Sequence, residues 1–526
     1  MRIERTKNAS RNILFTTILK IYQIVVPFFM RTAMVYLLGV QYLGLNSLFT
    51  SVLQVLNLAE LGVGSAMVYS MYKPIAEDDN KTICALMNLY KLYYRIIGAI
   101  VAIVGLLLLP FIPKLIHGSV PEDINIYILY LLNLGATVLS YWLFAYKNSI
   151  LQAHQRTDVI SKVSLITETV KYVCQLLTLA LFHNYYLFVI VVLLTQILNN
   201  IIIAFFSNKF YPDFSAQGKL PREEVKKING RIKDLFTSKL GWVILNSADT
   251  IVISSFLGLT VLAIYQNYYF IITAVIGLVA GVFSSCTAGI GNSLVIESKE
   301  KNFGDFKVFT FLIVWLAGVC TSCFLCLFQP FMRIWMGQEY LVDFSVVICL
   351  GIYFFLYEIN QLFNLYKDAA GKWHEDRFRP LITSLVNLVL NLLLVNYWGL
   401  YGIILSTVFA MLFVGMPWLL HTIFASVFEK KYLKEYISCI FKYISVVFVV
   451  NLLVFAICSY VKVSDVLTII IRGSICIIGT NLFLIILFHR EKEFIRSVDI
   501  IDKMTKGKLK LKKKISKQSD NGSTIC

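Results

Sequence analysis

Long apolar runs separated by short polar loops are the dominant pattern of this sequence. A run of about 20 apolar residues, at 1.5 Å per residue, is long enough to cross roughly 30 Å of hydrocarbon. The runs are continuous, whereas the strands of a membrane barrel alternate in polarity over about ten residues. They therefore predict an all-α polytopic membrane protein. We expect about fourteen transmembrane helices, at residues 11–38, 43–70, 86–112, 124–146, 158–182, 186–207, 236–257, 262–290, 308–331, 344–366, 379–396, 400–424, 437–460 and 466–489.

The distribution of charge in the loops predicts the orientation of these helices, because cytoplasmic loops collect Lys and Arg. One set of alternating loops, which includes 208–235 and the tail, carries nearly all the loop cations. The opposite set offers only Lys114, Arg333 and Lys462. Both termini are therefore predicted to be cytoplasmic. The same bias and the basic tail, expected to be a disordered segment near anionic lipid, explain most of the net charge of +17 without a nucleic acid partner.

Composition and motifs narrow the class of protein. With 58% hydrophobic and 15% charged residues and a mean hydropathy of +0.72, the chain is neither an ordinary soluble domain nor a disordered one. It has no Gly-rich phosphate loop, no H-E-x-x-H or G-x-S-x-G motif and no outer loop large enough for a catalytic domain. We therefore expect a transporter and not an enzyme.

The first expected span carries charge inside its apolar run. Lys20, Gln23, Pro27 and Arg31 follow at spacings of three, four and four, so they share one face of a helix. A charge at the centre of a membrane helix costs about 2.5 to 3.5 kcal/mol, and such residues usually face a bundle interior or a watered cavity. This face is therefore predicted to line a polar cavity. The alternative is that Lys20 and Arg31 extend to the headgroups on opposite sides.

The second expected span carries a polar residue at nearly every turn. Asn46, Thr50, Gln54, Asn57 and Glu60 follow at spacings of three or four and share one helix face. This stripe offers hydrogen-bonding groups along nearly the whole length of the span. Its alternative role is to hold helices together.

Two later spans repeat this pattern with ionisable residues. In the fifth, Glu168 and Lys171 can pair across one turn, which also fits a structural role. In the seventh, Lys239 and Asp249 lie on one face, together with Trp242 and Asn246. Asp249 is a titratable carboxylate that could couple transport to a proton or sodium ion.

Arg95 and Glu358 are further candidates, whereas Ser384, Asn387 and Asn391 share a face suited to helix–helix hydrogen bonds. The predicted substrate-binding residues are Lys20, Arg31, Asn57, Glu60, Arg95, Lys171 and Lys239. The predicted ion-coupling residues are Asp249, Glu60, Glu168 and Glu358.

The cysteines and histidines do not predict a metal site or a cofactor. Cys320, Cys323 and Cys326 have the spacing of part of an iron–sulfur ligand set, but they lie inside a span and lack a fourth cysteine followed by Pro. We interpret the eleven cysteines as reduced side chains that fill helix packing. The six histidines lie near loops and helix ends without metal-ligand spacing.

A weak internal repeat predicts the domain organisation. An offset of 219 residues places Gly258 on Gly39 and Lys239 on Lys20. Because six helices is an even number, two six-helix lobes would keep the same orientation in the membrane. The predicted parts are an N-terminal lobe 1–207, a basic cytoplasmic linker 208–235, a C-terminal lobe 236–424, two additional helices 425–490 and a basic cytoplasmic tail 491–526.

Several short motifs resemble a known family. They are Leu38-Gly39, Tyr42-Leu43-Gly44, the stretch from Leu58 to Ala66, Asn387 with Asn391, and Gly399-Leu-Tyr-Gly402. Over about residues 8 to 490 the chain resembles bacterial Wzx-type polysaccharide-unit flippases of the multidrug/oligosaccharidyl-lipid/polysaccharide (MOP) exporter superfamily. The resemblance implies two six-helix lobes around a central cavity that opens alternately to either side.

The resemblance also implies the substrate. It would be an oligosaccharide repeat unit on undecaprenyl diphosphate, moved to the outer leaflet of the bacterial cytoplasmic membrane for capsule, exopolysaccharide or O-antigen synthesis. A polysaccharide polymerase or export machinery would be a partner, and a proton or sodium ion the coupling ion. A cationic face around Arg31 suits a diphosphate.

The alternatives are a lipid II flippase, a multidrug antiporter and a membrane enzyme. An antiporter would need a cavity dominated by acidic and aromatic residues. The spans here hold at least as many basic as acidic residues.

Overall fold

The structure is a computed structural model that describes residues 5–461 and 463–504. Within those ranges the chain is helical and contains no β-strand. Lys462 and the tail beyond residue 504 lie outside the described residues. The α-helices are α1 (Arg5–Leu37), α2 (Val40–Leu56), α3 (Val63–Ala76), α4 (Asn80–Leu108), α5 (Ile126–Trp142), α6 (Asn148–Ala153), α7 (Thr157–Leu177), α8 (Tyr185–Phe210), α9 (Arg222–Leu257), α10 (Leu259–Ser284), α11 (Thr287–Ile296), α12 (Lys299–Met336), α13 (Phe344–Ala369), α14 (Trp373–Asp376), α15 (Arg379–Ala410), α16 (Met416–Ser426), α17 (Leu433–Ser459), α18 (Asp465–Ser474), α19 (Thr480–Phe488) and α20 (Lys492–Met504).

Eleven helices among the described residues are long and apolar enough to cross a membrane, or twelve if a pair bent by 48° around residue 143 counts as one span. The all-α membrane fold is confirmed, but the number fourteen is not. The span expected at 43–70 is interrupted by a 3-10 turn, Asn57–Glu60, and by Gly62 in the left-handed region. The spans expected at 379–396 and 400–424 lie in one continuous stretch, Trp373–Ser426, that counts as a single span although two helices meet in it at Gly399, where φ is +54° and ψ is −129°.

The contacts divide the chain into two compact units, which we call unit 1 and unit 2. Unit 1 comprises Met1–Asn267 and Pro380–Ile403, and unit 2 comprises Tyr268–Arg379 and Ile404–Cys526. Both α10 and α15 contribute a part to each unit. The division into lobes, linker and appended helices stays a prediction.

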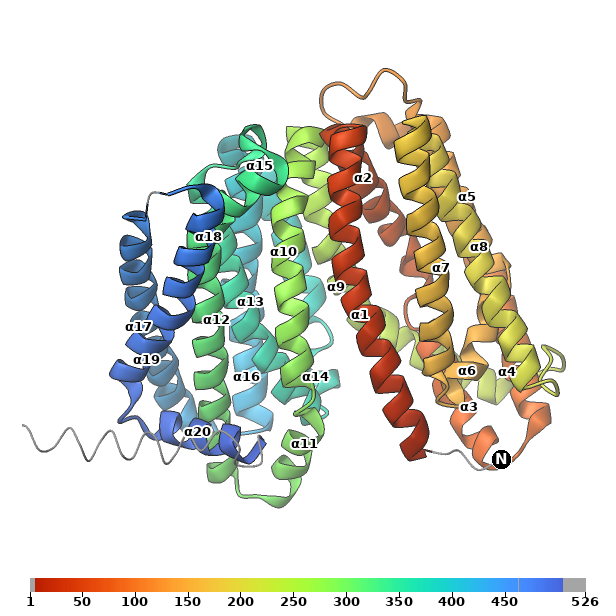
Figure 1. Ribbon diagram of the computed structural model, residues 1–526. Helices are drawn as coiled ribbons and strands as arrows, with labels where there is room; N and C mark the ends of the chain where they lie inside the picture. The colour runs from red at the N-terminus through yellow and green to blue at the C-terminus, as the bar shows by residue number, and fades with distance from the viewer. Residues whose placement is uncertain (1–4, 462, 505–526) are drawn as a thin grey trace, which may run out of the picture. The chain divides into compact units, whose positions relative to one another are not determined.

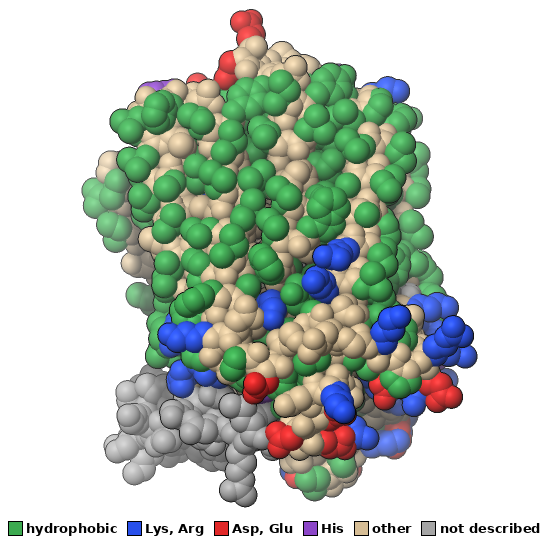
Figure 2. Space-filling view, turned by 90° about the vertical axis from the view of Figure 1, so that its right-hand side faces the viewer, with side chains coloured by type: hydrophobic (Ala, Val, Ile, Leu, Met, Phe, Trp, Pro, Cys, Tyr) green, Lys and Arg blue, Asp and Glu red, His purple; other side chains and the backbone are tan. Residues whose placement is uncertain are grey.

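In unit 1 the main helix pairs are α1 with α7, α7 with α8, α5 with α8, and α2 with α9, as Figure 1 illustrates. Gly39 and Gly258, which the repeat pairs, each join two consecutive helices and have φ values of +121° and +88°. A side chain is strained at such angles, so glycine is required at both joints. Figure 2 shows the face that includes α4, α5 and α8, where a broad hydrophobic band lies above a zone of Lys and Arg. Such a band is the surface expected to face lipid.

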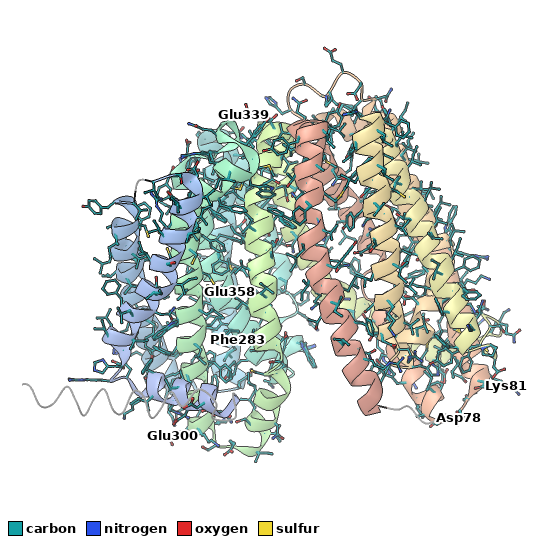
Figure 3. All side chains as sticks on the ribbon, in the orientation of Figure 1. Asp78, Lys81, Phe283, Glu300, Glu339 and Glu358 are labelled. Atoms are coloured by element: carbon teal, nitrogen blue, oxygen red, sulfur yellow. The ribbon has the colours of Figure 1, made fainter. Side chains whose placement is uncertain are left out.

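Unit 2 is built around α12, which packs against α13, α17, α18 and α20. In its core the rings of Phe306 and Tyr436 are both fully buried and stack with centroids 4.7 Å apart. Glu300, at the start of α12, and Glu339, just beyond its end, lie at opposite ends of the unit (Figure 3).

The tail begins with a helix, α20, which corrects the expectation that the tail is disordered from residue 491. Arg496 of α20 forms a 2.6 Å ion pair with Asp305 of α12, and Glu493 lies 3.7 Å from Lys307. These contacts within unit 2 hold the helix along α12.

Candidate functional site

Arg31 belongs to a polar network inside unit 1. Its guanidinium donates to the backbone oxygen of Gln266 at 3.5 Å and to Asn267 Oδ1 at 3.3 Å. Asn267 is buried, and the Gln266 amide donates to Thr250 Oγ1 of α9 at 2.9 Å. The network therefore joins α1, α9 and the first part of α10. It holds a permanent positive charge, whose burial is costly without such partners.

Asp249 lies on α9 next to Thr250 and is held by α15. Asn391 donates to the Asp249 carboxylate at 2.6 Å and to Asn387 Oδ1 at 3.4 Å. Both asparagines are fully buried, so the face predicted for helix–helix hydrogen bonds also positions a carboxylate. One further observation concerns Asn391: its own Oδ1 is buried and has no hydrogen-bond partner among the described residues.

Glu60 is enclosed by tyrosines. Tyr94 donates to Oε1 at 2.7 Å, Tyr141 donates to Oε2 at 2.8 Å, and the Tyr90 hydroxyl lies 2.6 Å from that of Tyr94. A side chain on Gly64 would meet the Tyr90 hydroxyl. Both carboxylate oxygens of Glu60 are therefore engaged, and the surroundings suit a fixed acceptor.

A small polar cavity of about 180 Å³ lies between α7 and α8. Glu168 Oε1 accepts a 2.7 Å hydrogen bond from Gln23 of α1, whereas its Oε2 is buried without a partner among the described residues. The Lys171 ammonium lies 4.2 Å from the centroid of the Tyr172 ring. The ion pair expected between Glu168 and Lys171 is not among the salt bridges of the described residues, because the lysine turns to the ring. The lining residues are Ser164, Thr167, Glu168, Lys171, Val192, Thr195, Gln196 and Asn199.

The other predicted residues of unit 1 are more dispersed. Lys20 and Arg95 are exposed, and the backbone oxygen of Arg95 accepts from Trp142 at 3.2 Å. Lys239 donates to Ser65 Oγ at 3.5 Å. Asn57 is the C-cap residue that follows α2, and its Oδ1 is buried without a partner among the described residues.

The face of α1 thus has two neighbours. Its Gln23 contacts α7, whereas its Arg31 contacts α10. Gln23 and Arg31 thus share one face of α1, as their spacing predicts, but they contact different helices.

Unit 2 contains Glu358, which lines a cavity of about 240 Å³. Its side chain belongs to α13 and is 1% exposed, and neither carboxylate oxygen has a hydrogen-bond partner among the described residues. Phe283 and Ser284 of α10, Ile313 of α12 and Gln361 of α13 also line the cavity. Figure 3 shows Glu358 and Phe283 away from both ends of the unit.

Sequence reasoning missed a charge cluster at the start of α7. Asp158 is fully buried and forms ion pairs with Arg11 and Arg156, both at 2.9 Å, and with Lys162 at 3.6 Å. The Asp158 partner from α1 is 147 residues away in sequence, so only the fold reveals it. The Arg156 guanidinium lies outside the spans, and its hydrogen bond to Asp158 raises its pKa.

The fold is similar to those of solved membrane transporters. The chain is 16% identical to a structure described as "Lipid II flippase MurJ, inward closed conformation", with a TM-score of 0.66 over 91% of this chain and 99% of that one. It is 15% identical to an inward-facing multidrug resistance MATE family transporter of the MOP superfamily, with a TM-score of 0.59 over 81% and 99% of the two chains. Identities this low establish the fold alone. The fold and its spans are therefore those of a multi-pass membrane protein that shares the fold of these transporters.

The family itself is shown by sequence. The model of the family described as "Polysaccharide biosynthesis protein" matches residues 9–287, just over half of the chain. The chain therefore belongs to the polysaccharide biosynthesis protein family, which confirms the resemblance found in the sequence. A comparison with curated protein sequences gave no match.

Proposed function

We propose that this protein is a flippase that moves undecaprenyl-diphosphate-linked oligosaccharide repeat units from the inner to the outer leaflet of the bacterial cytoplasmic membrane. The observation that carries the proposal is the family match over residues 9–287. The flipped unit would then enter synthesis of capsule, exopolysaccharide or O-antigen, and a polymerase or export machinery would receive it. The protein itself changes no covalent bond in this proposal.

Arg31 is the residue we assign to the anionic part of the substrate. A guanidinium can form two parallel hydrogen bonds to a phosphate, which makes Arg the preferred partner of a diphosphate. Two of its acceptors, a backbone carbonyl and an amide oxygen, are neutral groups that a phosphate can replace. Lys20, Lys171 and Lys239 would add positive charge, and Asn57 would hydrogen-bond sugar hydroxyls.

The coupling ion would bind at carboxylates inside the predicted spans. Glu358 is the strongest candidate, because a buried carboxylate without a donor needs a proton or a cation to offset its charge. Asp249 is the second, since it is a titratable carboxylate inside a span, where the hydrogen bond from Asn391 orients it. Glu60 is better suited to a structural role. Transport by alternating access, with both termini cytoplasmic, completes the proposal.

The test is export of surface polysaccharide in a deletion strain complemented with wild type, Arg31→Ala or a control variant, Lys81→Ala, at equal membrane abundance. Lys81 is an exposed cation at the end of unit 1 (Figure 3). We expect trapped lipid-linked repeat units in the deletion strain, full export with wild type and Lys81→Ala, and at least a tenfold loss with Arg31→Ala.

Two other results would contradict the proposal. If polysaccharide is unchanged and the deletion strain becomes drug-sensitive, the protein is a multidrug antiporter. If lipid II accumulates instead of repeat units, it is a lipid II flippase.

A further inference from the structure

Cysteines from three separate parts of unit 2 meet in its interior. They are Cys326 of α12, Cys458 of α17 and Cys476 of a π-helical turn, Ile475–Gly479, that follows α18. Their sulfur atoms all lie within 4.8 Å of one another, and the three residues are at most 1% exposed. A fourth, Cys323, precedes Cys326 by one helical turn and lies beside Cys476. The four residues are called the thiol cluster below.

The spacing of the sulfurs suits a metal ion. Cys458 Sγ and Cys476 Sγ are 3.9 Å apart. With metal–sulfur bonds of about 2.3 Å, two sulfurs on one ion are separated by about 3.8 Å in tetrahedral and about 4.0 Å in trigonal geometry. In the structure the Cys476 thiol donates to the Ser322 carbonyl at 3.6 Å, and the Cys458 thiol to the Arg472 carbonyl at 4.0 Å. Little movement would be needed to turn the sulfurs to a common centre.

A positive charge lies next to the thiol cluster. The Arg472 guanidinium donates to the Val461 carbonyl at 2.9 Å and to the Cys326 carbonyl at 3.5 Å. Its Nε is buried and has no partner among the described residues. Three thiolates around a divalent ion carry one net negative charge, which a single guanidinium can balance in apolar surroundings.

We propose that the thiol cluster binds one thiophilic d10 metal ion, Zn²⁺ or Cu⁺, through Cys326, Cys458 and Cys476, with Cys323 as the nearby fourth sulfur. Thiolate ligands select these ions over harder cations. Each ligand would lose its proton on binding, and no electron transfer is involved. The ion would tie α17 and the turn after α18 to α12, the central helix of the unit. This site is independent of the proposed transport function.

The first experiment measures metal content. The full chain is purified in detergent after growth with Zn²⁺ or with copper under reducing conditions, desalted, and measured by inductively coupled plasma mass spectrometry. We expect about one ion per chain in wild type and at least a tenfold loss in Cys326→Ser, Cys458→Ser and Cys476→Ser. The matched control is Cys439→Ser, which changes the same helix, α17, near its other end and should keep the ion. The two growth conditions show which ion binds.

A second measurement needs no variant, in case the serine variants fail to fold. Cd²⁺ added to the metal-free wild type should produce a thiolate-to-metal charge-transfer band that saturates at one equivalent. The proposal is wrong if wild type holds no more metal than the variants and gives no such band, in which case the cysteines only fill the core. It is also wrong if Cys458 and Cys476 are found joined in a disulfide.

Discussion

In unit 1 the Glu60 carboxylate accepts a hydrogen bond on each oxygen, whereas in unit 2 both oxygens of Glu358 are buried without any partner among the described residues. Each carboxylate belongs to a segment predicted to cross the membrane, and each was a candidate for ion coupling. Asp249 of unit 1 accepts a hydrogen bond from Asn391 of α15. Glu60 and Glu358 thus differ in how much of their bonding capacity the protein already uses.

This comparison separates structural from functional carboxylates. A buried group whose bonds are all made is costly to remove and has little to offer a ligand. A buried group whose bonds are not made destabilises the protein and persists where binding of a proton or cation offsets the cost. Substitutions should therefore have opposite effects on stability at Glu60 and Glu358.

The largest effect on stability is expected from Glu60→Ala. The substitution leaves the hydroxyls of Tyr94 and Tyr141 without their acceptor, which should lower the free energy of unfolding by about 3 kcal/mol. A thermal melt in detergent measures this. Glu77→Ala is the control and should melt like wild type, because the ion pair of Glu77 among the described residues, with Lys73 at 3.8 Å, is exposed. Equal melting of both variants would mean that the tyrosines do not depend on Glu60.

A smaller effect is expected from Asn391→Ala, which removes the donor to Asp249. We expect the free energy of unfolding to fall by about 2 kcal/mol. A double-mutant cycle with Asp249→Asn should give a coupling energy of about 1 kcal/mol. Asn396→Ala on the same helix is the control, since Asn396 is exposed and, within the part of the chain that the structure describes, donates to the Leu392 carbonyl of its own helix. A coupling of zero would show that the hydrogen bond does not position the carboxylate.

Glu358→Gln should change the stability of the protein in the opposite direction. Because the ionised carboxylate lacks a donor, the neutral amide should leave stability unchanged or raise it by about 1 kcal/mol. Export should nevertheless fall at least tenfold if Glu358 carries the coupling ion. Glu339→Gln, an exposed position beyond α12, should change neither quantity. A variant that melts lower than wild type would place Glu358 with Glu60, among the structural carboxylates.

The smallest effect concerns His154 of unit 1, outside the membrane spans. The ring is buried against Tyr211, with centroids 4.2 Å apart, and burial lowers the pKa of His154. The neutral ring is therefore favoured in the folded protein. Its contribution to the free energy of unfolding is fully present above the pKa of the unfolded state, about 6.5, and is lost as the pH falls through the lower pKa of the folded state. Between about pH 7.5 and about pH 5.5, the melting temperature of wild type should fall by more than that of His154→Phe. Equal decreases would contradict a neutral His154.

The sequence predicts the helical membrane fold well, because continuous apolar runs have few alternatives in a bilayer. It does not predict the break at Asn57–Gly62, since a 3-10 turn and one left-handed glycine leave the hydropathy of the run unchanged. The spacing along one helix correctly identifies polar faces. Their partners cannot be predicted this way: Tyr94 and Tyr141 count as apolar residues until the fold brings them to Glu60.

The thiol cluster shows the same limit. Its α12 members are visible as a spaced pair in the sequence, but Cys458 and Cys476 are more than 100 residues further along the chain. Only the packing of α17 and α18 against α12 brings the sulfurs together. A metal site made by distant parts of a chain has no local spacing to recognise.

The most direct test of the central claim is flipping by the purified protein. Proteoliposomes would carry a fluorescent undecaprenyl-diphosphate-linked oligosaccharide, and a membrane-impermeant quencher would report how fast the label crosses the bilayer. We predict that wild type and Lys81→Ala flip the label in the presence of a proton or sodium gradient, and that Arg31→Ala is at least tenfold slower. The flippase account would be contradicted if proteoliposomes with fully reconstituted wild type moved the label no faster than protein-free liposomes under either gradient.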